Sequence, residues 1–153
     1  MWNGGVRVII FDEEKRLLMV KQFHEGREFW LLPGGGIEEN ENSLEAAKRE
    51  ILEETGLEIK VGKLLWHIEE VSKERGMRFV NVFLGEIISG TPVLGADPEF
   101  DEAGQVLREV KFFKRGEVLN MEKVYPLQLK NELWELLDQG FIGHDPYRSR
   151  EHL

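Results

Sequence analysis

The segment that most restricts the fold of this chain runs from Gly35 to Leu57 and reads "GGIEENENSLEAAKREILEETGL". Its apolar side chains recur at helical spacing and predict a helix over 43–55 whose buried stripe is Leu44, Ala47, Ile51 and Thr55, widened by Leu52. Asn42 is suited to cap the helix start, with Glu45 completing a capping box, and Gly56 is suited to end the helix.

The same helix gathers three glutamates, Glu50, Glu53 and Glu54, within an arc of about 100° that faces roughly away from the predicted apolar stripe. Like charges at such spacing destabilise a helix by a few tenths of a kcal/mol per pair, so a compensating group is expected. Arg49 is placed to brace Glu45 or Glu53. A hard divalent cation such as Mg²⁺, which binds carboxylates, water and phosphate, would also compensate. A solvated acidic face is the alternative.

Composition limits the remaining classes. The chain has 153 residues, which predicts a single domain over 1–153. It has no cysteine, which excludes a disulfide framework, a thiolate nucleophile and a cysteine-based zinc site. The net charge of −9 argues against broad binding to nucleic-acid polymers. The apolar runs are too short to span a bilayer and no signal peptide is evident, so we expect no membrane partner and a cytoplasmic location. Whether the chain forms a homodimer is left open.

The rest of the chain alternates strands with one further helix. Two apolar runs around the turn "DEEK" predict a hairpin, and "REFWLLPGGG" predicts a short strand. The runs "LEIKVGKLLWHIEEV" and "MRFVNVFLGEII" predict a strand pair, and "REVKFF" predicts a last strand. The segment 89–105 reads as a surface loop, "YPLQLKNELWELLDQG" as a helix and 144–153 as a frayed tail. Strands with helices on opposite faces indicate an α+β fold, a three-layer αβα sandwich with a mixed β-sheet.

The spacing within the acidic segment is specific. Gly35 is followed by Glu41, then by Arg49 and Glu50, an apolar residue, Glu53 and Glu54, and finally a glycine and an apolar residue. This pattern resembles the box of the Nudix hydrolase (MutT-like) family at every defined position. The box covers 23 of the 153 residues, and the order of the surrounding elements also resembles the family. The resemblance implies the Nudix fold.

The resemblance also implies roles for individual residues. Glu50, Glu53 and Glu54 would be the ligands of Mg²⁺, with Mn²⁺ as a second suitable ion. Glu41 would lie near them and brace the loop or hold a water. Arg49 would orient a glutamate through a salt bridge rather than touch the substrate.

Gly35 and Gly56 would permit tight backbone turns beside the helix, which is a structural role. The implied reaction is hydrolysis of a nucleoside diphosphate linked to another moiety X, giving a nucleoside monophosphate and phosphorylated X. The implied partner is therefore a small nucleotide diphosphate.

The general base is less defined by the pattern. It would be a box glutamate or an acidic residue of the segment "GADPEFDEAGQ", which offers Asp97, Glu99, Asp101 and Glu102. Glu102 is the first choice because it precedes a glycine-containing turn near the last strand. An ordinary acidic loop is the alternative reading.

Further candidates lie on the predicted strands. Lys21, Arg7 and Arg27 are placed where cations could face the phosphates, and otherwise they are surface cations. Phe23, Trp30 and Phe79 could stack on a base, although core packing is the simpler reading for each.

The substrate itself is not evident from the sequence. Residues that distinguish some Nudix subfamilies, namely a proline or a tyrosine shortly after the box, are missing here. No proline occurs between Pro33 and Pro92, and the only tyrosines are Tyr125 and Tyr147. The main alternative activity is pyrophosphate removal from a nucleoside triphosphate. A module that senses nucleotides without catalysis is a different class, and the complete set of box glutamates counts against it. Action on RNA 5′ ends is a third alternative, which the acidic charge disfavours.

Overall fold

A computed structural model describes residues 4–93 and 106–152 of the chain. Its helices and strands occur in the following order along the sequence: β1 (Gly4–Ile10), β2 (Leu17–His24), β3 (Arg27–Leu31), β4 (Gly34–Gly36), α1 (Ser43–Thr55), β5 (Glu58–Ser72), β6 (Gly76–Ser89), β7 (Val106–Phe113), α2 (Arg115–Leu119), β8 (Val124–Tyr125), the 3₁₀ helix η1 (Leu127–Lys130), α3 (Glu132–Asp138) and β9 (Tyr147–His152). No helix within these residues is both long and apolar enough to cross a membrane.

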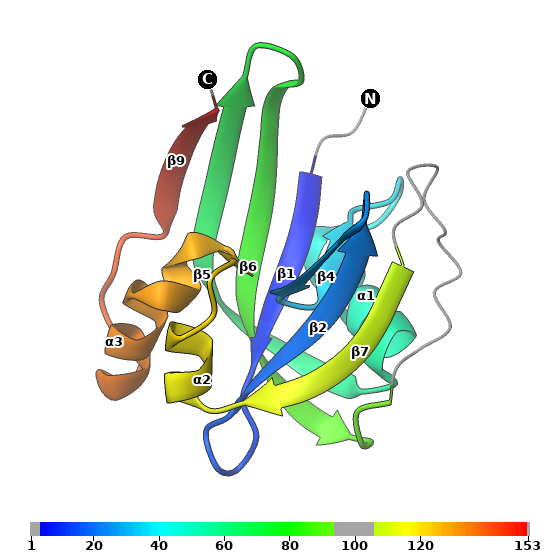
Figure 1. The fold of residues 1–153 in the computed structure, drawn as a ribbon, viewed down its shortest axis with the longest axis vertical. Helices are drawn as coiled ribbons and strands as arrows, with labels where there is room; N and C mark the ends of the chain where they lie inside the picture. Colours follow the sequence, from blue (N-terminus) through cyan, green and yellow to red (C-terminus); the bar gives the residue numbers. More distant parts are fainter. Residues whose placement is uncertain (1–3, 94–105, 153) are drawn as a thin grey trace.

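The strands form two sheets that lie between the helices (Figure 1). The larger one, here the β1 sheet, has the order β4-β1-β6-β5-β9, and the smaller one, the β2 sheet, has the order β7-β2-β3-β8. The β1 sheet is mixed, because β1 runs parallel to β6 and β5 runs parallel to β9, whereas the β5–β6 pair is antiparallel. The predicted three-layer α+β arrangement is confirmed, with two sheets in place of a single one.

Alternation along β1 explains why helices cover both faces. Val8 and Ile10 pack with Ile51 of α1 in one apolar cluster. Ile9 points the other way and packs with Trp134 of α3 in a second cluster. Successive side chains of a strand point to opposite faces, so a nearly continuous apolar run needs a cover on each side.

The hairpin predicted around the turn "DEEK" is wrong beyond its first pair. Only Phe11 and Leu17 pair across that turn. From there β1 pairs with β4 and β6, whereas β2 pairs with β3 and β7. The two strands therefore diverge into separate sheets, and each one pairs with two other strands of the chain.

The ends of α1 agree with the prediction. The Asn42 side chain accepts a hydrogen bond from the Glu45 N–H at 2.9 Å, and the Glu45 carboxylate accepts one from the Asn42 N–H at 3.1 Å. Gly56 ends the helix in the left-handed region with a φ of 73°, a conformation that side chains disfavour.

The predicted buried face of α1 needs correction. Leu44 and Leu52 are 46% and 56% exposed, whereas the carboxylate-bearing Glu50 and Glu54 are buried alongside Ile51. The acidic residues therefore do not lie opposite the core, because part of the buried face of α1 packs against the glycine strand β4 rather than against apolar side chains.

The C-terminal region also differs from the prediction. The single helix predicted near 125–140 is divided into η1 and α3 at Asn131, whose φ of −145° is not helical. The tail predicted to be frayed forms β9, which pairs in parallel with β5 along one edge of the β1 sheet (Figure 1). The short helix α2 was not predicted.

The capping box generates a stability prediction. Asn42→Ala should lower the free energy of unfolding by about 1 kcal/mol, because the N–H of Glu45 loses its acceptor. Lys48→Ala is the matched control, since Lys48 is an exposed residue of the same helix. Urea unfolding of both variants measures the difference. Equal decreases in the free energy of unfolding of the two variants would show that the Asn42 cap does not stabilise the protein.

Candidate active site

A cleft of about 650 Å³ opens between the β1 sheet and the β2 sheet, and α1, β4 and the β5–β6 turn complete its walls. The carboxylates of Glu50, Glu53 and Glu54 line one part of it, beside the backbone of β4. After the Phe11–Leu17 bridge, β1 and β2 belong to different sheets (Figure 1), and residues of both sheets line the cleft.

Two of these carboxylates are buried, with Glu50 4% and Glu54 8% exposed. Burial of a carboxylate is costly unless hydrogen bonds compensate for the lost water. Glu54 Oε1 accepts a hydrogen bond from the Gly34 N–H at 2.8 Å. Glu50 Oε1 accepts one from Arg49 Nη1 at 2.9 Å. The fold therefore holds both groups at the cleft wall, whereas the side chain of Glu53 is 33% exposed.

Gly35 permits this close approach of α1 to β4. A Cβ atom on Gly35 would lie 2.6 Å from the carboxylate of Glu50, well inside van der Waals contact. A larger residue here would displace that carboxylate, so Gly35 has a packing role at the cleft wall.

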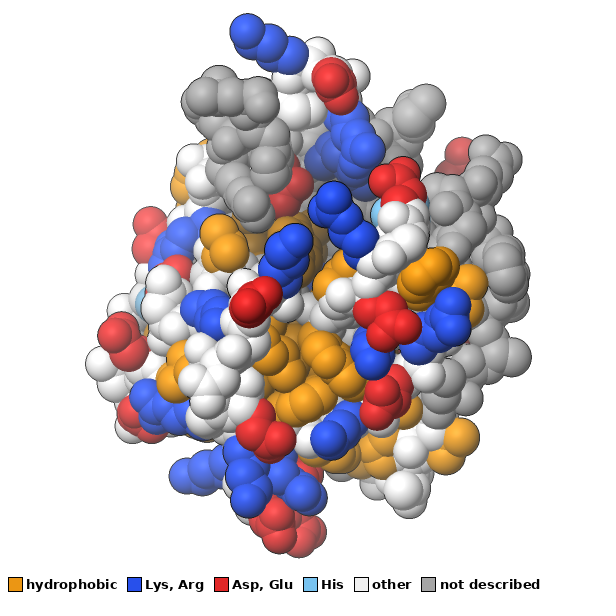
Figure 2. Space-filling view, viewed as in Figure 1, with side chains coloured by type: hydrophobic (Ala, Val, Ile, Leu, Met, Phe, Trp, Pro, Cys, Tyr) orange, Lys and Arg blue, Asp and Glu red, His pale blue; other side chains and the backbone are white. Residues whose placement is uncertain are grey.

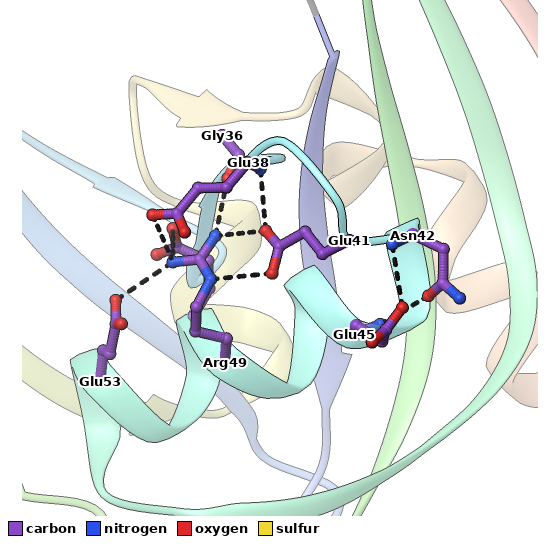
Figure 3. A network of polar contacts seen from close by, with 8 residues as sticks. Gly36, Glu38, Glu41, Asn42, Glu45, Arg49 and Glu53 are labelled. Atoms are coloured by element: carbon purple, nitrogen blue, oxygen red, sulfur yellow. Dashed lines mark hydrogen bonds and ion pairs between the residues drawn. The ribbon is translucent and has the colours of Figure 1, made fainter.

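Arg49 connects the acidic groups around the start of the cleft (Figure 3). It donates to both carboxylate oxygens of Glu41, from Nη2 at 2.7 Å and from Nε at 3.1 Å. The same guanidinium reaches Glu50, Glu53 Oε2 at 3.3 Å and the carbonyl of Gly36 at 3.0 Å. The hydrogen bond to Glu41 raises the pKa of Arg49, and the same bond lowers the pKa of Glu41. Arg49 thus supplies part of the compensation that the clustered glutamates require.

The donor set suits a hard divalent cation, since Glu50, Glu53 and Glu54 offer carboxylate oxygens and β4 offers backbone carbonyls. Within residues 4–93 and 106–152, however, no group of three acidic or histidine side chains is already gathered for metal coordination. The carboxylate oxygens are instead hydrogen-bonded to Arg49 and to the Gly34 N–H.

Of the cations predicted to face the phosphates, Arg7 lines the cleft and Lys21 does not. Arg7 lines the cleft, where its Nη1 donates to the carbonyls of Leu32 at 2.9 Å and Gly34 at 3.4 Å. Lys21 does not line the cleft and pairs with Glu28 at 2.9 Å, which raises the pKa of Lys21.

Arg27, the third predicted cation, is exposed at the start of β3 and is not among the residues that line the cleft. The structure therefore places Arg7, but not Lys21 or Arg27, in the same cleft as the acidic residues. Glu102 and the neighbouring candidate bases Asp97, Glu99 and Asp101 lie outside the described residues.

Of the predicted aromatic side chains, Phe79 lines the cleft. Trp30 packs edge-on against Phe113 with ring centroids 4.6 Å apart, and Phe23 lies beneath the guanidinium of Arg108 at 4.5 Å. Core or surface packing therefore accounts for Trp30 and Phe23.

Sequence reasoning missed several polar residues of the cleft, namely Gln22, Glu70, Arg75, Arg78 and Tyr125. Tyr125 Oη donates a hydrogen bond to Glu70 Oε1 at 2.7 Å. The alternation of β5 and β6 contained a signal for Glu70 and Arg78, which face the same side as the buried Ile68 and the partly buried Val80. No such signal existed for Tyr125, because β8 is only two residues long.

The described geometry agrees with comparisons to known proteins. The NUDIX domain family model matches residues 1–134. A Bacillus subtilis protein named as an 8-oxo-dGTP diphosphatase is 34% identical over 100 residues, which is 62% of this chain and 64% of that protein. The RNA pyrophosphohydrolase of Bartonella henselae is 33% identical over 127 residues, covering 66% of this chain and 73% of that protein. The match thus spans slightly less than two thirds of the Bacillus relative.

A solved structure shares the fold. The NUDIX hydrolase from Nitrosomonas europaea superposes with a TM-score of 0.71 and 22% identity, covering 92% of this chain and 90% of that one. Together with the family match over most of the sequence and the acidic helix packed against a glycine strand, this shows that the chain belongs to the Nudix hydrolase family.

Proposed function

We propose that the chain hydrolyses a pyrophosphate bond in a small nucleotide, with a divalent cation, Mg²⁺ or Mn²⁺, held by Glu50, Glu53 and Glu54. The observation that carries this proposal is the position of those three carboxylates at the wall of a cleft large enough for a nucleotide. A surface helix with no function would be expected to leave such charges in water rather than bury Glu50 and Glu54.

The proposed reaction needs side chains that position the metal ligands and a side chain that accepts a proton. Arg49 donates hydrogen bonds to Glu41, Glu50 and Glu53 and so orients these carboxylates at the cleft wall before a metal binds. Arg7 donates hydrogen bonds to the backbone carbonyls of Leu32 and of Gly34 in β4. A bound divalent ion would stabilise charge on phosphoryl oxygens and acidify water. Glu102 is the proposed general base that takes the proton of the attacking water.

The proposed substrate is a nucleoside diphosphate linked to a moiety X, which would give a nucleoside monophosphate and phosphorylated X. A nucleoside triphosphate is the second candidate, and the name of the Bacillus relative favours it. Within the described part of the face in Figure 2, Lys and Arg side chains are interspersed with Asp and Glu. This mixture favours a small nucleotide over a long nucleic acid, which needs a continuous basic surface.

Activity should depend strictly on a divalent cation. A panel of nucleoside diphosphate derivatives and triphosphates, assayed for released phosphate after a coupling phosphatase, should show turnover with Mg²⁺ or Mn²⁺ and none in excess EDTA. Millimolar Mg²⁺ should also raise the melting temperature, because it binds the folded site better than the unfolded chain. Full turnover in EDTA would rule out the proposed site.

Glu54 and Glu45 provide a matched comparison on one helix. Glu54→Gln keeps an acceptor for the Gly34 N–H but removes a ligand charge, so kcat/KM should fall by about tenfold to a hundredfold or more. Glu45→Gln should change kcat/KM less than a few-fold, since Glu45 lies at the exposed helix start. Only Glu54→Gln should lose the Mg²⁺-induced rise in melting temperature. Equal activity of the two variants would place the metal elsewhere.

The assignment of Glu102 is tested through the pH dependence of turnover. Glu102→Gln should lower kcat by about a hundredfold or more, because a general base contributes rate enhancement of that order. It should also remove the acidic limb of the pH–rate profile while leaving the Mg²⁺-induced rise in melting temperature intact. Glu45→Gln, at the exposed start of α1, is the control. An unchanged profile for Glu102→Gln would exclude Glu102 and leave the role to Asp97, Glu99, Asp101 or a box glutamate.

A further inference from the structure

We propose that Glu70 determines base specificity, and that it selects a nucleobase presenting two adjacent N–H donors, as guanine does. This inference rests on the proposed function, because it assigns the nucleobase to the part of the same cleft that lies away from the acidic helix. It adds a chemical class of base to a substrate so far defined only by its pyrophosphate bond.

The first observation is a hydrogen bond that crosses the cleft. Tyr125 of β8, in the β2 sheet, donates its Oη hydrogen to Glu70 Oε1 of β5, in the β1 sheet, at 2.7 Å. Both residues line the cleft and both are partly buried. Because the phenol hydrogen is directed to Glu70, the carboxylate and the phenol oxygen offer acceptors to a ligand. Tyr125 is accordingly a positioning residue that fixes the orientation of Glu70.

The second observation is the neighbour of Glu70 on the next strand. Arg78 of β6 stands directly opposite Glu70 in the antiparallel β5–β6 register, so both side chains project from the same face of the sheet. Arg78 also lines the cleft. A guanidinium only donates hydrogen bonds, so a group of donors lies beside a group of acceptors.

The arrangement of hydrogen-bond donors on Arg78 beside acceptors on Glu70 distinguishes the nucleobases. The Watson–Crick edge of guanine carries a carbonyl acceptor followed by the N1–H and the 2-amino donors, which match Arg78 and Glu70 in that order. Hypoxanthine keeps the N1–H but lacks the 2-amino group, and adenine offers a single amino donor beside an acceptor nitrogen. A site that contains buried polar groups rejects analogues that leave those groups unpaired.

The walls around this polar pair can hold the flat faces of a base. Phe29 and Leu31 of β3, Val80 of β6 and Leu107 of β7 line the same cleft with apolar surface. Contact of aromatic and apolar side chains with a base face is tolerant of base identity, so it supplies affinity without discrimination. Discrimination would therefore fall to Glu70 and Arg78.

The test measures binding of GMP, IMP and AMP to the full chain by calorimetry, which does not require turnover. The wild-type chain should bind GMP about tenfold to a hundredfold more tightly than IMP, as expected for one hydrogen bond to a charged group. AMP should bind no better than IMP. Glu70→Gln should reduce the GMP-to-IMP ratio to within a few-fold, and Tyr125→Phe should reduce it by a smaller factor without lowering the melting temperature.

Glu69→Gln is the matched control. Glu69 is the residue of β5 next to Glu70 and is not among the residues lining the cleft. Its Oε2 lies 3.8 Å from His67 Nε2. This variant should keep the wild-type GMP-to-IMP ratio. Equal binding of the three monophosphates by the wild-type chain, an unchanged ratio in Glu70→Gln or a lost ratio in Glu69→Gln would each overturn the proposal.

The binding data, taken together with the hydrolysis panel described under the proposed function, separate this proposal from the proposed function. Selective binding of GMP that depends on Glu70, combined with no hydrolysis of any nucleotide, would contradict the hydrolytic function and support the specificity site. Metal-dependent hydrolysis with no preference among the three bases would support the function and contradict the specificity site.

Discussion

The guanidinium of Arg49 is the group on which the acidic side of the cleft depends. It contacts Glu41, Glu50 and Glu53 together with the carbonyl of Gly36, and so joins α1 to the loop that precedes it and to β4. A buried carboxylate left without its partner costs several kcal/mol. Loss of Arg49 would remove the hydrogen bond that the buried Glu50 Oε1 accepts at 2.9 Å.

A backbone constraint complements this ion pair. Strand β4 consists of Gly34, Gly35 and Gly36, and it pairs with β1 on one side while it meets Glu50 and Glu54 of α1 on the other. A Cβ atom on Gly34 would lie 2.0 Å from the Val6 carbonyl oxygen of β1, and one on Gly35 would displace the Glu50 carboxylate. The close packing therefore turns two helix positions that would be core positions in an ordinary amphipathic helix into buried acidic groups at a cleft wall.

The cleft between the two sheets has two chemically different parts. One part carries carboxylates from α1, whereas the other part carries the hydrogen-bonded Tyr125 and Glu70 beside Arg78. A nucleotide is chemically divided in the same way, into an anionic phosphate part that attracts cations and a base with donor and acceptor edges. The proposed orientation of the substrate follows from that correspondence.

Local features of the fold were predictable from the sequence, and features that depend on distant partners were not. The bounds and caps of α1 are encoded within a few residues, so Asn42, Glu45 and Gly56 could be placed correctly. The burial of Glu54 could not be predicted, because it depends on the Gly34 N–H from another element.

The same distinction explains the errors elsewhere. The β1–β2 hairpin was wrong because each strand has better partners far along the chain, and β9 was missed because its polar sequence gains strand structure only by pairing with β5. Lys21 appeared suited to phosphate binding, yet its sheet places it against Glu28. The cleft residues Glu70 and Tyr125 come together only after both sheets have formed.

The most direct measurement is a crystal structure of the chain soaked in Mn²⁺, with anomalous scattering used to locate the metal. The proposed site predicts an anomalous peak bounded by the carboxylates of Glu50, Glu53 and Glu54, with Glu50 and Glu53 turned from Arg49 toward the ion. A Glu54→Gln crystal treated in the same way should show a weaker peak or none. A strong peak elsewhere, with Glu50, Glu53 and Glu54 still bonded as described here, would contradict the assignment of the metal to this helix.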